Sequence, residues 1–122
     1  MHEMGVALEI YRHCREQAKE HRALRIEGVK VAVGELSAIE PELLKFAWEA
    51  TVAESPDHGA ALEIDWRPCV QVCTTCGQEP ERSQGSWLRL CSSCGSPLEV
   101  SGGLELDIVE IALEIDEEVE IG

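Results

Sequence analysis

The chain has 122 residues, enough for one ordinary domain or for a small domain that carries a smaller insertion. Its net charge is −14, from 24 acidic and 10 basic residues, and this argues against a nucleic-acid partner, because such binding needs lysine and arginine to neutralise phosphates. No apolar run approaches the about 20 residues that span a bilayer, and the N-terminus lacks the apolar core of a signal peptide. We therefore expect a cytoplasmic protein without a membrane partner.

The segment from residue 4 to about residue 22 predicts an amphipathic helix. Apolar residues recur there at steps of three and four, which is the helical period: Met4, Ala7, Leu8, Tyr11, Cys14 and Ala18. Because Cys14 belongs to this stripe, we interpret it as a small core residue and not as a ligand or nucleophile. His13 and His21 lie off the stripe and are expected in solvent.

A strand followed by a second helix is predicted for residues 24–52. Val29, Val31 and Val33 alternate with other residues, as in a strand, and Gly28 marks an expected irregularity. Pro41 suits the first turn of the helix and makes Glu40 its expected cap. The apolar stripe of this helix is Leu43, Leu44, Ala47, Trp48 and Val52.

Two further strands are predicted, over residues 60–67 and 104–115. In the first, Leu62, Ile64 and Trp66 share one face. The second changes phase near Ile108, where a β-bulge would keep all its apolar residues facing the core; a central strand buried on both faces is the alternative. The acidic segment 116–122 is expected to fray.

This order of elements predicts an α+β fold with some α/β character: a small three-stranded sheet with two helices on one face. A zinc-ribbon-like module is expected between the second and third strands. We assign residues 1–68 and 100–122 to the α/β domain and residues 69–99 to the inserted module. The insertion has few large apolar residues, so we expect metal binding to supply its folding free energy.

Two Cys-x-x-Cys pairs, Cys73 with Cys76 and Cys91 with Cys94, flank the segment 77–90. Each pair predicts a tight turn that presents two thiolates, and two such turns can enclose one tetrahedral ion. The glycine that follows each pair fits such a turn. We predict a structural Zn(II) site, because four thiolates leave no coordination position open for chemistry.

Other uses of these cysteines remain as alternatives. Rubredoxin-like iron fits the same ligands, and disulfides or free dithiols are the further choices. A thioredoxin-like redox pair is disfavoured because the pairs lack a strand–helix context. Cys69 precedes the first pair by four residues, and we interpret it as strand-end packing or a spare thiol.

The first residues, Met1-His2-Glu3, offer a different set of metal donors. The Met1 amine, which we expect to stay free because a histidine in second place prevents removal of the methionine, can join the His2 backbone nitrogen and imidazole around one ion. Such nitrogen donors suit a tetragonal ion such as Ni(II) or Cu(II). Glu3 could complete the set through its backbone nitrogen or its carboxylate.

The sequence resembles the HypA/HybF family of nickel-insertion factors over nearly its whole length. The resemblance rests on Met1-His2-Glu3, on Val31-Ala32-Val33-Gly34-Glu35-Leu36-Ser37 with Glu40-Pro41-Glu42 and Phe46-Ala47-Trp48-Glu49, and on the two Cys-x-x-Cys pairs.

This resemblance implies a metallochaperone and not an enzyme. It implies nickel binding by His2, with Met1 as a co-ligand and Glu3 close by, and structural zinc on Cys73, Cys76, Cys91 and Cys94. Glu40 corresponds to an acidic position near the nickel site or a partner contact. The implied partners are a GTP-hydrolysing accessory protein, HypB, and the large-subunit precursor of nickel-iron hydrogenase, with urease maturation as a further role of some members.

Two other functions compete with this one. A zinc-ribbon adaptor that binds a protein or nucleic acid without handling nickel would bind one metal ion per chain and be indifferent to changes at His2. A hydrolytic metalloenzyme would need an open zinc site beside a base, and neither His58 nor the scattered carboxylates form such a motif.

Overall fold

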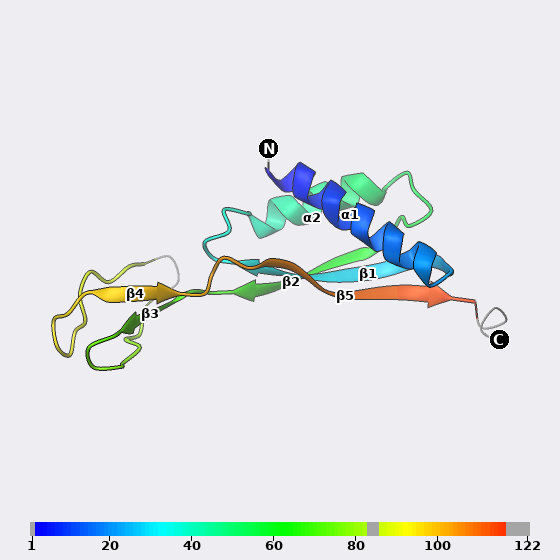
Figure 1. Ribbon diagram of the computed structural model, residues 1–122. Coiled ribbons are helices and arrows are strands. Elements are labelled where there is room, and N and C mark those ends of the chain that lie inside the picture. The colour runs from blue at the N-terminus through cyan, green and yellow to red at the C-terminus, as the bar shows by residue number, and fades with distance from the viewer. Residues whose placement is uncertain (1, 83–85, 117–122) are drawn as a thin grey trace.

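The computed structural model describes residues 2–82 and 86–116. Its elements are α1 (His2–Glu20), β1 (Ala23–Gly34), α2 (Pro41–Val52), β2 (Ala61–Arg67), β3 (Val70–Cys73), β4 (Leu98–Ser101) and β5 (Leu106–Ile115). Figure 1 shows α1 and α2 on one face of the sheet formed by β2, β1 and β5, while β3 and β4 extend past one end of that sheet. The predicted fold class is confirmed. Segment 116–122, which we expect to fray, lies outside the described residues except for Asp116.

β1 is the central strand of the sheet. It pairs in parallel with β2 and antiparallel with β5. Parallel neighbours need a crossover connection, which α2 supplies. The side chains that β1 and β2 turn toward the helices form the core with both helices: Ala7, Ile10, Cys14, Ala18, Ile26, Val29, Val31, Val33, Ile39, Leu44, Ala47, Trp48, Val52, Ala60 and Leu62.

The predicted bulge in the last strand is confirmed. Lys30 pairs with Glu110 and Val31 pairs with Ile108, so Val109 is the extra residue. Ile108 precedes the bulge, and Ile111 and Leu113 follow it. Because of the extra residue, all three pack against the same core despite the change of phase. The alternative of a central strand is wrong, because β5 lies at the edge of the sheet.

Both predicted helices form, but their buried faces differ in detail from the predicted stripes. α2 follows Glu40 and begins with Pro41, as expected. Leu8 and Leu43 are each 54% exposed, whereas Ile10, absent from the predicted stripe, is 6% exposed. The reason is that the two helices lie together over only three strands, so each helix has a narrow face covered by the sheet and its partner.

Among the described residues of the α/β layer, Asp57 is a charged residue that is fully buried. Asp57, in the loop before β2, accepts hydrogen bonds from the Tyr11 hydroxyl at 2.7 Å and from the Ile26 N–H at 2.7 Å. The Arg15 guanidinium donates to the same carboxylate at 3.0 Å. Asp57 therefore fastens its loop to α1 and β1, a role that the loop composition did not predict.

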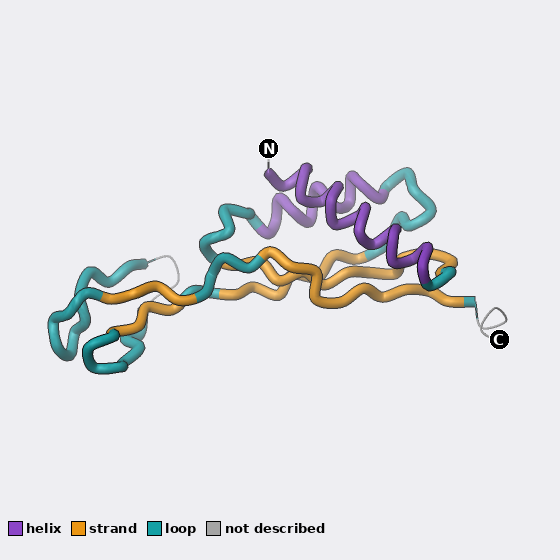
Figure 2. The backbone as a smooth tube through the Cα atoms, in the orientation of Figure 1, coloured by secondary structure: helices purple, strands orange, loops and turns teal. Residues whose placement is uncertain are grey.

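The cysteine module is mostly loop, apart from the short antiparallel pair of β3 and β4 (Figure 2). Sequence analysis did not predict these two strands, because four residues each are too few to show alternation. Apolar side chains in the module are largely exposed, including Val70, Trp87, Leu90 and Val100. Burial therefore contributes little to the module's stability.

Candidate metal sites

The two Cys-x-x-Cys segments form matching turns. In the first, the Gly77 N–H donates to the Cys73 carbonyl at 2.7 Å, and the Cys73 N–H donates to the Gln78 carbonyl at 2.9 Å. The second repeats this pattern, with the Gly95 N–H donating to the Cys91 carbonyl at 2.8 Å. Both glycines have a φ of +76°, where a side chain would be strained, so the sequence-based reason for these glycines is confirmed.

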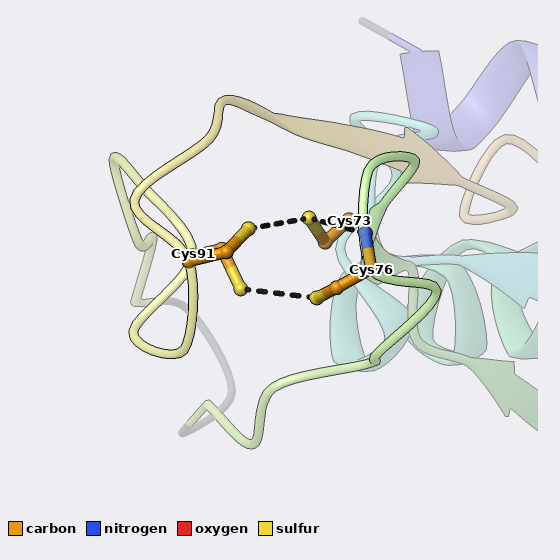
Figure 3. Close-up of side chains that lie close together, drawn as sticks. Cys73, Cys76 and Cys91 are labelled. Atoms are coloured by element: carbon orange, nitrogen blue, oxygen red, sulfur yellow. Dashed lines mark hydrogen bonds between the residues drawn. The ribbon is translucent and has the colours of Figure 1, made fainter.

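The turns bring the four predicted ligands together. The Sγ atoms of Cys73, Cys76, Cys91 and Cys94 all lie within 4.8 Å of one another. The Sγ atoms of Cys73 and Cys94 are 3.4 Å apart. Those of Cys76 and Cys91, which face each other in Figure 3, are 3.7 Å apart. Zinc–sulfur bonds of about 2.3 Å place the sulfurs of a tetrahedral site about 3.8 Å apart, so this donor set fits a zinc-like ion.

Hydrogen bonds prepare the second turn to offer thiolates. Those from the side chain and backbone of Ser96 lower the pKa of Cys94 to about 6, and a backbone hydrogen bond from Cys94 lowers the pKa of Cys91. A backbone hydrogen bond from Gln78 also favours the Cys76 thiolate, but contacts with neighbouring sulfurs and burial outweigh it and raise the pKa of Cys76 to about 12. These hydrogen bonds favour the thiolate form of Cys94 and Cys91 over the thiol.

The N-terminal candidate site is placed only in part. Met1 lies outside the described residues, and of His2 only the backbone, which begins α1, is described. Glu3 is 9% exposed, and its Oε2 accepts the Glu40 N–H at 3.1 Å. Glu40 itself is exposed and its side chain makes no capping bond to α2. The structure therefore brings Glu3 and Glu40 together, with the Glu3 carboxylate satisfying a backbone donor at the start of α2.

The remaining predicted residues stand outside these sites. Cys14 is buried in the core, as predicted, and Cys69 is buried but separate from the cluster of four. Among the side chains of residues 3–82 and 86–116, that cluster is the one group of three or more His, Cys, Asp or Glu residues spaced to hold a metal ion. No helix in the described part of the chain is long and apolar enough to cross a membrane.

Comparisons with known proteins agree with this arrangement. The sequence model of the family described as "Hydrogenase/urease nickel incorporation, metallochaperone, hypA" matches residues 1–113. The hydrogenase maturation factor HypA of Dechloromonas aromatica is 34% identical over 115 residues, which cover 93% of this chain and 100% of the relative. The HypA of Chlorobaculum parvum is 31% identical over 115 residues, with the same two coverages, 93% and 100%.

Solved structures lead to the same family. The solution structure of the Ni metallochaperone HypA from Helicobacter pylori aligns with a TM-score of 0.62 and 26% identity, covering 95% of this chain and 100% of that one. A second solution structure of a HypA protein aligns with a TM-score of 0.64 and 27% identity, covering 95% and 98%. The chain belongs to the HypA family of hydrogenase maturation factors, which are nickel metallochaperones and not enzymes.

Proposed function

We propose that this protein carries Ni(II) and delivers it during maturation of the large subunit of nickel-iron hydrogenase. The observation that carries this proposal is the match to a nickel-incorporation family over residues 1–113, a range that contains both the N-terminal donors and the four cysteines. A carrier must release its ion as well as bind it. Nitrogen donors at the chain terminus permit stepwise ligand exchange, which a closed cage of four thiolates resists.

Nickel is proposed to bind at the N-terminus through the His2 imidazole, the Met1 amine and backbone nitrogen, with Glu3 completing the set. α1 begins at His2, and the first N–H groups of a helix have no acceptor within it. Deprotonating them for nickel therefore breaks no helical hydrogen bond. The Glu3 carboxylate accepts the Glu40 N–H, and this contact joins the terminus to the start of α2. It supports the proposal that Glu40 is a neighbour or partner contact of the nickel site.

The four cysteines Cys73, Cys76, Cys91 and Cys94 are proposed to hold a structural Zn(II). Their sulfur donors and mutual distances support this assignment. When bound, zinc would supply the free energy that the sparse apolar contacts of the module do not. The cysteines would then fix the two turns and the loop between them in one arrangement.

The proposed partners are the hydrogenase large-subunit precursor and a HypB-type GTPase, with urease maturation proteins as further clients. The maturation role implied by the family supports a protein partner, and the net charge of −14 disfavours nucleic acid. We place the protein in the cytoplasm, because six cysteines that form no disulfide suit a reducing compartment.

Nickel titration of the zinc-loaded protein tests the N-terminal site. Changes around a metal's ligands commonly cost 10- to 100-fold in affinity, so losing a ligand in His2→Ala should weaken nickel binding by at least about tenfold. His13→Ala, which removes an exposed histidine of the same helix, is the matched control and should bind like the wild type. Equal nickel affinity of His2→Ala and the wild type would contradict nickel binding at the N-terminus.

A residue added before Met1 gives a second test, because it displaces the terminal amine without altering any side chain. We expect weaker nickel binding and an unchanged zinc content. Nickel affinity of the wild type should also fall as the pH drops through about 6.5, where free imidazole gains a proton. Loss of both metals in the extended protein would contradict two separate sites.

A further inference from the structure

The two segments that connect the cysteine module to the α/β layer both contact the end of β1. The Glu35 N–H donates to the Arg67 carbonyl at 2.9 Å, next to the segment that enters the module. The Leu36 N–H donates to the Gly103 carbonyl at 2.6 Å, on the segment that returns. Glu35 and Leu36, which directly follow β1, thus contact both connecting segments, and we call these two residues the base of the module.

A buried ion pair joins this base to the loop between the two cysteine turns. The Arg82 guanidinium contacts both carboxylate oxygens of Glu35, at 2.5 and 3.2 Å, and the two side chains are only 7% and 9% exposed. Arg82 also donates to the Cys69 carbonyl at 2.9 Å and lies over the Trp87 ring, 4.6 Å from its centroid. A buried charge pair of this kind is costly to break from one side, because the remaining charge stays desolvated.

The thiol of Cys69 is enclosed by the same contacts. It is 3% exposed and lies 3.3 Å from Glu35 Oε1 and 3.0 Å from the Arg82 guanidinium. Its backbone N–H donates to Glu35 Oε1 at 3.1 Å. A Cβ atom on Gly103 would lie only 2.6 Å from the Cys69 Cβ, so the returning segment closes the other side. The Cys69 thiol is thus covered by Arg82 from the loop between the cysteine turns, by Glu35 and by the returning segment.

We propose that Arg82 is a positioning residue that latches the cysteine module to the α/β layer through Glu35, and that metal binding by the four cysteines keeps this latch closed. Arg82 and Trp87 both belong to the loop between Cys76 and Cys91, so the cage fixes both ends of the loop that carries them. Opening of the cage frees these ends and releases the latch. The proposed effect of metal on the latch rests on the zinc site proposed above. The latch itself rests on the contacts between Arg82 and Glu35.

The accessibility of Cys69 to iodoacetamide, measured by peptide mass spectrometry on the zinc-loaded full chain, tests the latch. In Arg82→Met we expect labelling at least about tenfold faster than in the wild type, while Cys14 stays unlabelled and the zinc content is unchanged. Arg82 lowers the pKa of Cys69, although burial and Glu35 raise it overall. Removing Arg82 therefore makes the thiol less reactive, and faster labelling must come from exposure.

Arg89→Met removes an exposed cation from the same loop and should label at the wild-type rate. Labelling of Arg82→Met at the wild-type rate would overturn the latch. If Cys14 also reacts in Arg82→Met, because that variant does not fold, Arg82→Lys replaces it. Lysine keeps the charge but lacks the planar fork, so we expect an intermediate rate, and the wild-type rate in this variant would again overturn the proposal.

Hydrogen exchange of the Cys69 amide in the wild type tests the metal dependence. After zinc is removed with a chelator, we expect exchange to become at least about tenfold faster. Equal exchange with and without zinc would overturn the link between cage and latch. If the protein binds no zinc, the zinc site fails, and the comparison of Arg82→Met with wild type still decides the latch.

Discussion

The α/β layer and the cysteine module obtain their stability from different sources. In the α/β layer, apolar side chains from two helices and a three-stranded sheet pack into one core. In the described part of the module, the paired strands β3 and β4 have four residues each. Side chains such as Trp87 and Leu90 are about half exposed there, at 47% and 54%. Hydrophobic burial can hold the first part without a metal ion, whereas we expect the second to depend on metal binding by its four cysteines and on its contacts with the first.

The largest expected effect is the loss of the module after metal removal. Structural zinc contributes an apparent free energy of about 10–16 kcal/mol in zinc-finger peptides at pH 7, more than the module's apolar contacts can replace. A chelator, or Cys76→Ser, should therefore abolish hydrogen-exchange protection in β3 and β4. β1 and α2 should stay protected. Simultaneous loss of protection in both parts would contradict separate sources of stability for the module and the α/β layer.

The second largest effect should come from the core. Trp48 is 1% exposed, and its Nε1–H donates to the Ala60 carbonyl at 2.8 Å. Trp48→Ala should lower the free energy of unfolding of the α/β layer by about 3–5 kcal/mol, measured by denaturant titration, with zinc content unchanged. Phe46 in the same helix is 71% exposed, so Phe46→Ala should change stability by less than about 0.5 kcal/mol. Similar losses in both variants would contradict the assigned core.

A smaller effect, dependent on pH, is expected at Asp57. Burial raises the pKa of Asp57, but hydrogen bonds from Ile26, Tyr11 and Arg15 outweigh it and hold that pKa below its usual range. Because the pKa is lower in the folded state, the carboxylate stabilises the protein above its unfolded pKa and loses this effect as the pH falls through the folded pKa. The stability of the wild type should therefore decline below about pH 5.

Asp57→Asn should remove this part of the pH dependence and cost about 2 kcal/mol at neutral pH, because a hydrogen-bonded charge is lost. Asp65→Asn, at a half-buried carboxylate on the sheet surface paired with Arg67, is the control and should have a much smaller effect. Denaturant titrations at several pH values measure both. An unchanged pH profile in Asp57→Asn would show that this carboxylate does not fasten its loop.

The smallest expected change in stability concerns Glu3. Glu3→Ala leaves the Glu40 N–H without this acceptor and should cost about 1 kcal/mol, as for a lost helix cap. Glu3→Gln keeps a side-chain oxygen in that place and should cost less. Nickel affinity should follow the same order if this contact positions the terminus. Wild-type stability and nickel affinity in Glu3→Ala would rule out the positioning role.

Short sequence patterns predicted the features that depend on neighbouring residues: the bulge in β5, the cysteine turns and the start of α2. The phase change in residues 104–115 predicted a bulge near Ile108, because an added residue lets a strand bury both phases on one face, and the structure has it at Val109. The cysteine spacing predicted the cluster of four sulfurs, because each pair forms its own turn. Pro41 marked the start of α2, because its fixed φ and missing N–H suit the first turn of a helix.

Long-range polar contacts escaped prediction. Glu3 with Glu40, Asp57 with Tyr11, and Glu35 with Arg82 each join residues that are far apart in the sequence. No periodicity marks such partners, since a single charged residue reads as solvent-exposed until the fold brings its partner close. The missed contacts lie at the N-terminal site, at the loop before β2 and at the base of the module. Each of them joins a terminus or a loop to another part of the fold.

Counting nickel and zinc per chain in one experiment tests the two-site account most directly. Untagged wild type, His2→Ala and Cys91→Ser are loaded with both metals, desalted and measured by plasma mass spectrometry. We predict that His2→Ala loses nickel and keeps one zinc per chain, and that Cys91→Ser loses zinc and retains the α/β layer that carries the N-terminal donors. A His2→Ala protein that keeps its nickel, or loses zinc along with it, would contradict the account.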